Sequence, residues 1–380
     1  MKITHPAVQY HFSDLVDGLM ACVKEGTVNV SRKGDLALFN YSETCTFEHK
    51  WNEFSLISRG FILDMVQEKI IALTFPKFFN HSEKEGSKIL RFDAPFDTFQ
   101  KMDGSLGIVF WFNNSWHVAT RGSFHSDQAK WAESWLHQNN SLMGKMDKNV
   151  TYLTEIIYPE NRIVIKYDFE GLVLLGAYNR VTGAELDYNT ELLPFCNSSG
   201  MRIAPNQSFH SFMEAQEFVK TLPSDQEGFV IRYCDTGDRL KLKGDAYCSL
   251  HKMISGLTPL GIWELLCQNY SVDDYKKAMP EEFHDEIDEI VGHFLSVQGT
   301  IMSNILMMAH SVAELSDRDL GIKIQQGDLK GVKYATMLFP YRKHGIDMLK
   351  KLILKELRPT GNKLEGYRPS SSLHRVQISD

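Results

Sequence analysis

The sequence predicts an α+β protein in which a domain of antiparallel sheets with flanking helices precedes an all-helical domain. With 380 residues, 43% of them hydrophobic, the chain is long enough to bury two cores. From about Asp35 to Lys243, short β-rich runs are separated by turn residues, and after Tyr247 the apolar residues take helical spacing. We therefore expect a first domain over residues 1–250, a helical domain over 251–358 and a polar tail over 359–380.

The individual elements follow from hydrophobic periodicity and turn signals. A hairpin is predicted because β-rich runs at Leu106–Phe112 and Trp116–Arg121 flank a turn-forming Asn-Asn-Ser. Further strands are predicted at Thr151–Ile157, Ile163–Tyr167, Leu172–Tyr178, Phe229–Tyr233 and Leu240–Lys243. Helices are predicted from Ser126 or Asp127 to about His137, and over Ser211–Lys220, Leu260–Gln268, Pro280–Leu315 and Gly345–Leu357.

Charge and cysteine content exclude several classes of protein. The formal net charge of −7 excludes a generally basic, histone-like surface, so any nucleic-acid site must be local. From Lys330 to Asp380 there are 11 Lys plus Arg against 4 Asp plus Glu, a pattern typical of either an RNA-backbone contact surface or a solvated helix face. The six cysteines form no close pairs, which fits neither a disulfide framework nor a zinc cluster. Apolar segments such as Ile301–Met308 are too short to span a bilayer, so we expect a soluble cytoplasmic protein.

The most informative segment is a lysine set just before a turn that feeds into a strand. Its residues are Lys101-Met102-Asp103-Gly104-Ser105-Leu106. To attack a phosphorus atom, Lys101 must be neutral, which requires a pKa depressed by nearby cations or by burial. Asp103 and Gly104 would let the backbone approach a nucleotide closely. Taken alone, the pattern is more typical of an exposed lysine at the start of a turn.

Charged residues in later strands fit the same chemistry. Glu155 lies inside an apolar strand, Glu227 opens another, and Lys241 and Lys243 share one face of a strand by the period-two rule. Taken separately, they would fit an edge strand defended by lysines, with solvent-facing glutamates. A nucleotide site accounts for them together, because lysines neutralise phosphate oxygens, one carboxylate holds a metal ion and another accepts hydrogen bonds from ribose.

The order Lys-x-Asp-Gly, acidic strand, Glu-Gly strand and Lys-x-Lys resembles the covalent nucleotidyltransferases, which comprise polynucleotide ligases and mRNA capping enzymes. Within that group, residues from about Tyr41 to Tyr247 resemble the bacteriophage RNA ligase 1 family, the tRNA-repairing type. The resemblance implies an ATP-grasp-like nucleotidyltransferase domain. The matching motifs are Ser58-Arg59-Gly60, Pro76-Lys77-Phe78-Phe79-Asn80, the Lys101 segment, Pro159-x-Asn161-Arg162-Ile163-Val164 and Lys241-x-Lys243-x-Asp245-x-Tyr247-x-Ser249-Leu250-His251.

The resemblance implies a role for each matched residue. Lys101 would be the nucleophile that carries AMP. The remaining assignments place Arg59, Lys77, Lys241 and Lys243 around the ATP phosphates, Tyr41 and Glu155 at the nucleoside, and Glu227 and Tyr247 beside the transferring phosphate. Glu227 would also be a metal ligand. The plain alternatives are a strand-edge ion pair for Arg59, packing beside two phenylalanines for Lys77, a surface salt bridge for Glu227 and a core position for Tyr247.

Two positions depart from the family pattern or match it loosely. Arg121 stands where the family commonly has a lysine, which keeps the charge but changes the geometry of a phosphate or 3′-end contact. Asp273, followed by Asp274, falls near the place of an acidic pair associated with magnesium in the family. Aspartates at a helix start are also common capping residues.

The implied function is an ATP-dependent, Mg²⁺-requiring RNA ligase that joins 5′-phosphate and 3′-hydroxyl ends, with broken tRNA as the expected RNA. Such a protein would act as a monomer, in the host cytoplasm if the source is viral. Two alternatives stay open. An mRNA capping guanylyltransferase is less favoured because that group, like DNA ligases, usually has an OB-fold where residues after 250 are predicted to be helical. A non-catalytic RNA-end-binding protein is disfavoured by the intact set of Lys101, Glu227, Lys241 and Lys243.

Overall fold

The computed structural model describes residues 2–280 and 283–360. The chain divides into two compact units at the Ser249–Leu250 bond, and each unit is considered by itself below. Most of the predicted polar tail, residues 361–380, lies outside the described residues, as do residues 281–282 next to the expected helix start at Pro280.

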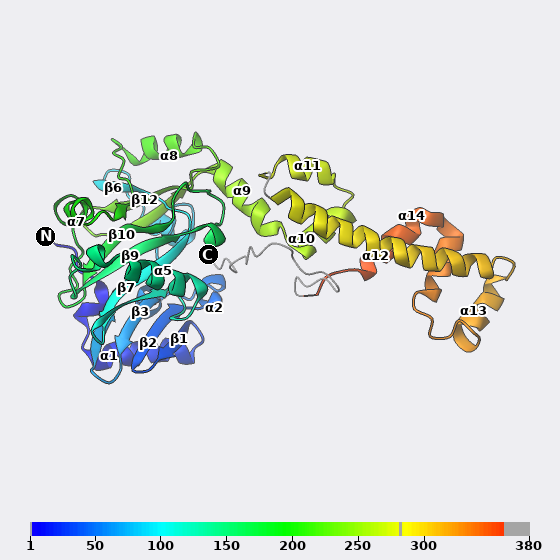
Figure 1. Ribbon diagram of the computed structural model, residues 1–380, viewed down its shortest axis with the longest axis horizontal. Coiled ribbons are helices and arrows are strands. Elements are labelled where there is room, and N and C mark those ends of the chain that lie inside the picture. Colours follow the sequence, from blue (N-terminus) through cyan, green and yellow to red (C-terminus); the bar gives the residue numbers. More distant parts are fainter. Residues whose placement is uncertain (1, 281–282, 361–380) are drawn as a thin grey trace. The chain divides into compact units, whose positions relative to one another are not determined.

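The first unit is built on three sheets (Figure 1). In spatial order, the first sheet contains β1 (Val28–Lys33), β2 (Leu36–Tyr41), β3 (Arg59–Asp64) and β4 (Lys69–Ala72). The second contains β11 (Arg202–Ile203), β10 (Gly171–Asn179), β9 (Val150–Ile157), β7 (Ser105–Phe112) and β8 (Ser115–Thr120). The third contains β5 (Phe79–Asn80), β13 (Arg239–Lys243), β12 (Gly228–Tyr233) and β6 (Phe96–Gln100).

The α+β prediction with antiparallel sheets is confirmed, with two short exceptions. β11 pairs in parallel with β10, and β5 pairs in parallel with β13. The helices that flank these sheets are α1 (Phe12–Lys24), α2 (Glu43–Phe47), α3 (Glu53–Ile57), α4 (Lys84–Ile89), α5 (Asp127–Gln138), α6 (Asn140–Met143), α7 (Leu193–Ser199) and α8 (Phe212–Lys220). Short helical turns cover Pro6–Gln9, Pro159–Asn161 and Tyr188–Leu192.

The second sheet is buried on both faces. Ile108 and Phe110 of β7 join a core shared with the first sheet, whereas Val109 between them joins a core shared with α5 and α7. This alternation follows from the period-two geometry of a strand. Every residue of β9 is buried, including Glu155. Figure 1 shows α5 lying across this sheet. A polar side chain in β9 therefore faces either a core or an internal cavity.

The hairpin and two of the helices predicted from local sequence signals are present in the structure. Asn113 and Asn114 have φ of 46° and 61° between β7 and β8, the left-handed backbone that a two-residue hairpin turn requires. The Ser126 side chain accepts a hydrogen bond from the backbone of Ala129 at the start of α5. Ser211 caps α8 in the same way through the backbone of Glu214. These helices therefore begin where their capping residues predicted.

The predicted strand at Ile163–Tyr167 is wrong, because this segment is irregular. The backbone N–H groups of Val164 and Ile165 both donate to Oδ2 of Asp103, each at 2.8 Å. A side chain thus takes the donors that a strand would offer to a neighbouring strand. The apolar alternation of this segment could not reveal that competition.

The described part of the second unit is helical. Its helices are α10 (Pro259–Cys267), α11 (Val272–Lys277), α12 (His284–Ser311), α13 (Asp317–Gln326) and α14 (Leu338–Glu356), with a short turn at Ala335–Met337. α9 (Asp245–Gly256) contains the boundary between the units. Ile305 of α12 packs in one core with Leu349 and Ile353 of α14. Gly345 has φ of 77° and interrupts α14 where the sequence predicted a helix start.

α12 corrects one expectation from the sequence. Its apolar part belongs to a continuous helix of 28 residues, which is long and apolar enough to cross a membrane by length and composition alone. The expectation that the apolar segments are too short to span a bilayer is therefore wrong for the helix that contains Ile301–Met308. A core helix of a soluble protein has the same properties, and α12 carries Asp285 and Glu286 in its first turn and packs on α14.

Candidate active site

The link between two sheets positions Lys101. β6 of the third sheet ends at Gln100 and β7 of the second sheet begins at Ser105, so the lysine lies where the chain passes from one sheet to the other. The backbone N–H of Lys101 donates to the carbonyl of Gly228 at 2.9 Å. Its Nζ is 2.6 Å from Oε1 of Glu227. Residues at the start of β12 thus hold both the backbone and the side-chain ammonium group of Lys101.

Glu227 is the central buried carboxylate of this site. It is 2% exposed, and its Oε1 is also 3.3 Å from Nζ of Lys243. Its Oε2 is buried and has no hydrogen-bond partner in the described part of the chain. A buried carboxylate oxygen without a donor is costly. Glu227 therefore has one coordination position free for a cation.

The ion pair reverses an expectation about Lys101. Burial alone would lower its pKa, but the carboxylate of Glu227 outweighs burial and raises the pKa above its ordinary value. The sequence predicted a depressed pKa for an attacking amine, whereas in the structure Lys101 is paired with Glu227 and its raised pKa favours the protonated form. Reaction at Lys101 requires added positive charge or a displaced carboxylate to release that proton.

Glu155 lies within β9, opposite Leu106 of β7 and Val173 of β10. It is 9% exposed, so the alternative of a solvent-facing glutamate is wrong. Burial raises the pKa of Glu155 to about 8, against the opposing effect of Lys101. The protonated carboxyl can donate one hydrogen bond and accept another, which suits a ribose hydroxyl.

Asp103 holds the irregular segment after β9 against the Lys101 link. Besides the backbone of Val164 and Ile165, it accepts a hydrogen bond at Oδ1 from the hydroxyl of Tyr247 at 2.8 Å. Its own backbone N–H donates to the hydroxyl of Tyr167 at 2.9 Å. Burial and Glu227 raise the pKa of Asp103. The structure gives Asp103 and the buried Tyr247 positioning contacts within the protein.

Gly104 is required by a protein contact. A Cβ at this position would lie 2.6 Å from the carbonyl oxygen of Ile156 and 3.1 Å from Cγ of Glu155. The sequence predicted that this glycine allows close approach of a nucleotide. In the structure, the neighbour that excludes a side chain is β9, so Gly104 brings Lys101 and Glu155 close together.

Three further cationic side chains lie around Tyr41, which the resemblance places at the nucleoside. Nη1 of Arg121 donates to the hydroxyl of Tyr41 at 2.9 Å, and Nζ of Lys77 lies 4.9 Å from the centroid of the Tyr41 ring. Burial alone would raise the pKa of Tyr41, but Arg121, Arg59 and Lys77 together lower it. The structure therefore groups these cations around Tyr41.

Arg59 and Lys241 have no ion-pair partner among the described residues. Arg59 lies over Phe78, with 4.9 Å between its Cζ and the ring centroid, and its buried Nη1 has no acceptor in the described chain. Burial, and then the charge of Lys101, bring the pKa of Lys241 well below its ordinary value. β13 lies between β5 and β12, so the alternative of an edge strand defended by lysines is wrong. A charged ligand is the natural partner for these groups.

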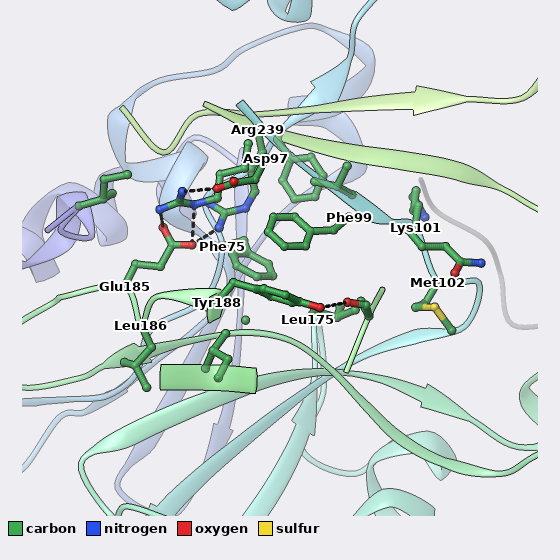
Figure 2. Close-up of a pocket in the computed structure, with 18 of the residues that line it drawn as sticks. Phe75, Asp97, Phe99, Lys101, Met102, Leu175, Glu185, Leu186, Tyr188 and Arg239 are labelled. Carbon is green, nitrogen blue, oxygen red and sulfur yellow. Dashed lines mark hydrogen bonds and ion pairs between the residues drawn. The ribbon is translucent and has the colours of Figure 1, made fainter. Parts of the chain in front are cut away.

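A cavity of about 400 Å³ lies beside some of these groups, but Tyr41, Lys77, Arg121, Glu227 and Lys243 are not among its lining residues. Its size is typical of small-ligand sites. Arg59, Lys101, Glu155 and Lys241 line it, together with apolar side chains that include Leu106, Leu175 and Val230. Figure 2 shows Lys101 and Met102 on one side and Glu185 and Asp97 on the other, with Phe75, Phe99 and Tyr188 between them. The cavity therefore has a cationic region, an apolar middle and a second polar region.

Sequence reasoning missed the second polar region. The carboxylate of Glu185 accepts a hydrogen bond from Nε of Arg232 at 3.0 Å and also forms an ion pair with Arg239. Nη1 of Arg232 lies 3.2 Å from Oδ2 of Asp97. Arg232 and Arg239 are directly paired in the register of β12 and β13, a juxtaposition that period-two patterns could have suggested. Glu185 carried no local signal, because its partners are 47 and 54 residues away.

Asp273 belongs to the second unit. It is exposed in the first turn of α11, where Ser271, and not an aspartate, is the N-cap. Asp274 pairs with Lys277 at 3.0 Å. In the described residues, no three His, Cys, Asp or Glu side chains are grouped to hold a metal ion. Nothing in the local geometry of Asp273 supports its tentative assignment as a metal ligand.

Glu155 should make the stability of the protein depend on pH. Its folded-state pKa of about 8 exceeds the ordinary 4.5, so the folded state binds this proton more tightly and loses that advantage as pH rises from about 5 to 8. Urea unfolding should show that Glu155→Gln gains free energy of unfolding relative to the parent over this range, on the order of a few kcal/mol. Glu160→Gln, at an exposed acid, is the control. Parallel pH curves for parent and Glu155→Gln would contradict the shift.

Comparisons with known proteins place the chain in a family. Residues 57–247, just over half of the 380 residues, match the family model described as RNA ligase, of the T4 RNA ligase 1 type. A protein of Autographa californica nuclear polyhedrosis virus, named for a bifunctional polynucleotide kinase/RNA ligase, is 28% identical over 244 residues, covering 57% of this chain and 34% of that protein. This chain thus spans about a third of that relative's length.

Two further similarities extend over more of the chain. An RNA ligase of Rhodothermus phage RM378 is 23% identical over 333 residues, covering 68% of this chain and 73% of the phage protein. A solved archaeal ATP-dependent RNA ligase is 12% identical with a TM-score of 0.49, covering 74% of this chain and 79% of that one. The family match rests on the segment that contains Lys101, Glu155 and Glu227. The chain therefore belongs to the T4 RNA ligase 1 family of RNA ligases.

Proposed function

We propose that this protein is an ATP-dependent RNA ligase that carries AMP on Lys101 and seals RNA 5′-phosphate and 3′-hydroxyl ends. The observation that carries the proposal is the position of Lys101 on a cavity, paired with Glu227 and close to Arg59 and Lys241. A nucleophilic amine, a buried acid and surplus positive charge are the groups that transfer of a nucleotidyl group requires.

The charge distribution suggests how a nucleotide lies in the site. The triphosphate would lie among Arg59, Lys77, Arg121, Lys241 and Lys243, because anionic oxygens offset the cost of their burial. The apolar middle of the cavity, between Leu106, Leu175 and Val230, would take the base. Glu155 would contact the ribose. This arrangement leaves the α-phosphorus beside Lys101.

A divalent metal ion fits this site through Glu227, whose Oε2 lacks a partner in the described residues. Mg²⁺ commonly takes one or two carboxylates and completes its coordination with phosphate oxygens and water, so a group of three protein ligands is unnecessary. When bound, it would supply positive charge that neutralises phosphate oxygens and lowers the pKa of Lys101.

The chemistry proceeds in three phosphoryl transfers. Deprotonated Nζ of Lys101 forms a bond to the α-phosphorus of ATP as the bond to pyrophosphate breaks. An oxygen of the RNA 5′-phosphate then displaces Lys101, which gives an adenylylated 5′ end. Finally, a 3′-hydroxyl attacks that 5′-phosphate, loses its proton and expels AMP. Lys101, Lys241 and Lys243 stabilise the charge on the transferring phosphates.

The helical second unit favours a ligase over a capping enzyme. Capping guanylyltransferases usually follow this kind of core with an OB-fold, whereas the described part of the second unit consists of helices. We further propose that this unit selects the RNA, with broken tRNA as the natural substrate. Residues 330–360 carry 8 Lys plus Arg against 2 Asp plus Glu, which favours contact with a phosphate backbone.

Lys101→Ala should abolish transfer of label from α-labelled ATP to the protein, because Lys101 lines the cavity beside the buried Glu227. Lys2 also lines the cavity, but its partner Glu191 is partly exposed to solvent. Lys88→Ala, at an exposed lysine of α4, should label normally. Denaturing electrophoresis followed by peptide mapping measures both. Labelling of the Lys101 variant, or a tagged peptide elsewhere in the parent protein, would overturn the assignment; labelling from GTP alone would favour the capping alternative.

Lys241→Met should separate activity from stability. Burial and the neighbouring cations bring the pKa of Lys241 well below its ordinary value, so replacing this unfavourably placed amine should raise the melting temperature. The same change should reduce the rate of lysine adenylylation by roughly 100-fold, as for other groups that stabilise transition-state charge. Lys69→Met, at an exposed lysine of β4, is the matched control and should change neither quantity much. A Lys241→Met variant that loses stability yet keeps activity would show that Lys241 has a structural role.

Reversing exposed charges of the second unit should weaken RNA selection without affecting the nucleotide chemistry. Lys343→Glu with Lys351→Glu is expected to flatten the salt dependence of RNA binding and reduce the preference for a nicked anticodon stem-loop over linear RNA. Lysine adenylylation should be unchanged. The control pair, Lys24→Glu with Lys88→Glu, makes the same charge change in the first unit. Identical salt slopes for the two double variants would leave the second unit without a role in RNA selection.

A further inference from the structure

Three aromatic rings surround the ammonium group of Lys77. Its Nζ lies 4.9 Å from the centroid of Tyr41, 5.4 Å from that of Trp51 and 5.2 Å from that of Phe79. No carboxylate lies within ion-pair distance of it among residues 2–280 and 283–360. In the described chain, aromatic rings, and no carboxylate, therefore surround this half-buried ammonium group.

Trp51 is the central member of the cage. Its ring makes edge-to-face contacts with both other members, at centroid distances of 5.2 Å and interplanar angles of 74° to Tyr41 and 79° to Phe79. It lies between α2 and α3, outside the sequence motifs that indicated the nucleotide site. The backbone N–H of Lys77 donates to the carbonyl of Leu56 at 2.7 Å, which fixes the lysine at its base. The cage fixes the other end.

Aromatic rings and a carboxylate hold a lysine with different consequences. A carboxylate neutralises the charge and accepts from the ammonium hydrogens, as Glu227 does for Lys101. Ring faces attract the cation through their quadrupole and leave its net charge in place for a third group. The cage therefore orients Lys77 and leaves its full positive charge for an anion.

The neighbours of the cage indicate the kind of anion. The hydroxyl of Tyr41 accepts from Arg121, and the pKa of Tyr41 is lowered by Arg121, Arg59 and Lys77 against the effect of burial. Arg59 has a buried Nη1 without an acceptor in the described chain. Burial, then Lys101 and Lys77, bring the pKa of Lys241 well below its ordinary value. So many cations in one place suit a group with several negative charges, such as a polyphosphate.

We propose that Trp51 is a positioning residue for the β- and γ-phosphates of the nucleotide, acting through Lys77. This inference rests on the proposed ligase function and adds to it. Its consequence is selective: Trp51 matters in the step that uses ATP and releases pyrophosphate. It does not matter in sealing an RNA whose 5′ end already carries AMP, because that substrate has no γ-phosphate and no pyrophosphate leaving group.

The test compares Trp51→Leu and Trp51→Phe in the full chain. In lysine adenylylation, Trp51→Leu should raise the KM for ATP by roughly 3- to 30-fold, the range expected for a lost cation–π contact, and weaken inhibition by added pyrophosphate to a similar degree. Trp51→Phe keeps an aromatic face and should recover most of the loss. Sealing of pre-adenylylated RNA should stay within about twofold for both variants.

Trp111→Leu is the matched control, because Trp111 also holds a lysine, with Nζ of Lys148 at 4.3 Å, in another part of the first unit. It should leave the KM for ATP unchanged. Equal losses in adenylylation and in sealing for Trp51→Leu would show a merely structural role, and an unchanged KM would remove any role; either result overturns the inference. If the parent protein fails to label with ATP at all, the proposed function fails first, before the Trp51 comparison is reached.

Discussion

The buried carboxylate of Glu227 sets the arrangement of the site. A charge that is 2% exposed must be compensated, and Lys101 and Lys243 compensate it through the same oxygen. Lys101 comes from the link between two sheets, and Lys243 from the strand next to Glu227, so the ion pairs join the second and third sheets. The ion pair with Glu227 also raises the pKa of Lys101 against the effect of burial, which favours the protonated lysine.

The cations around this pair fall into two groups that differ in how they are held. Lys101 and Lys243 have a carboxylate, whereas Lys77 has aromatic rings and Arg59 has a ring and an unused donor. Held by apolar or π surfaces, the second group keeps its charge at a cost in folding free energy. Residues that a protein places at such a cost are good candidates for ligand binding, because a ligand can relieve it. The lowered pKa of Lys241 has the same origin.

Asp103 shows how a motif residue can serve the structure of the site. Its carboxylate accepts two backbone donors of the segment after β9 and the hydroxyl of Tyr247, which is 144 residues away. These bonds fix the segment that sequence periodicity wrongly predicted as a strand. They also place Tyr247 at the start of α9, so three distant stretches of chain meet at one side chain. Gly104, the next residue, has no side chain and so allows close approach of the backbone of β9.

The sequence by itself determined the fold class, most of the elements and the chemical type of the site. Alternation in β7, capping serines at α5 and α8 and the paired asparagines of the hairpin are local signals, because strand and helix geometry depends on neighbours a few residues apart. The ordered motifs from Arg59 to Tyr247 gave the site its candidate residues, among them Lys101, Glu155 and Glu227.

Only the tertiary structure decided which of these groups touch. The pairing of Lys101 with Glu227 raised a pKa that the sequence led us to expect lowered, and burial brought the pKa of Glu155 to about 8. The cage of Trp51 around Lys77 and the charge cluster of Glu185 with two arginines join residues from separate elements. A pKa or an ion pair depends on distance and burial in three dimensions, and a linear pattern carries neither quantity.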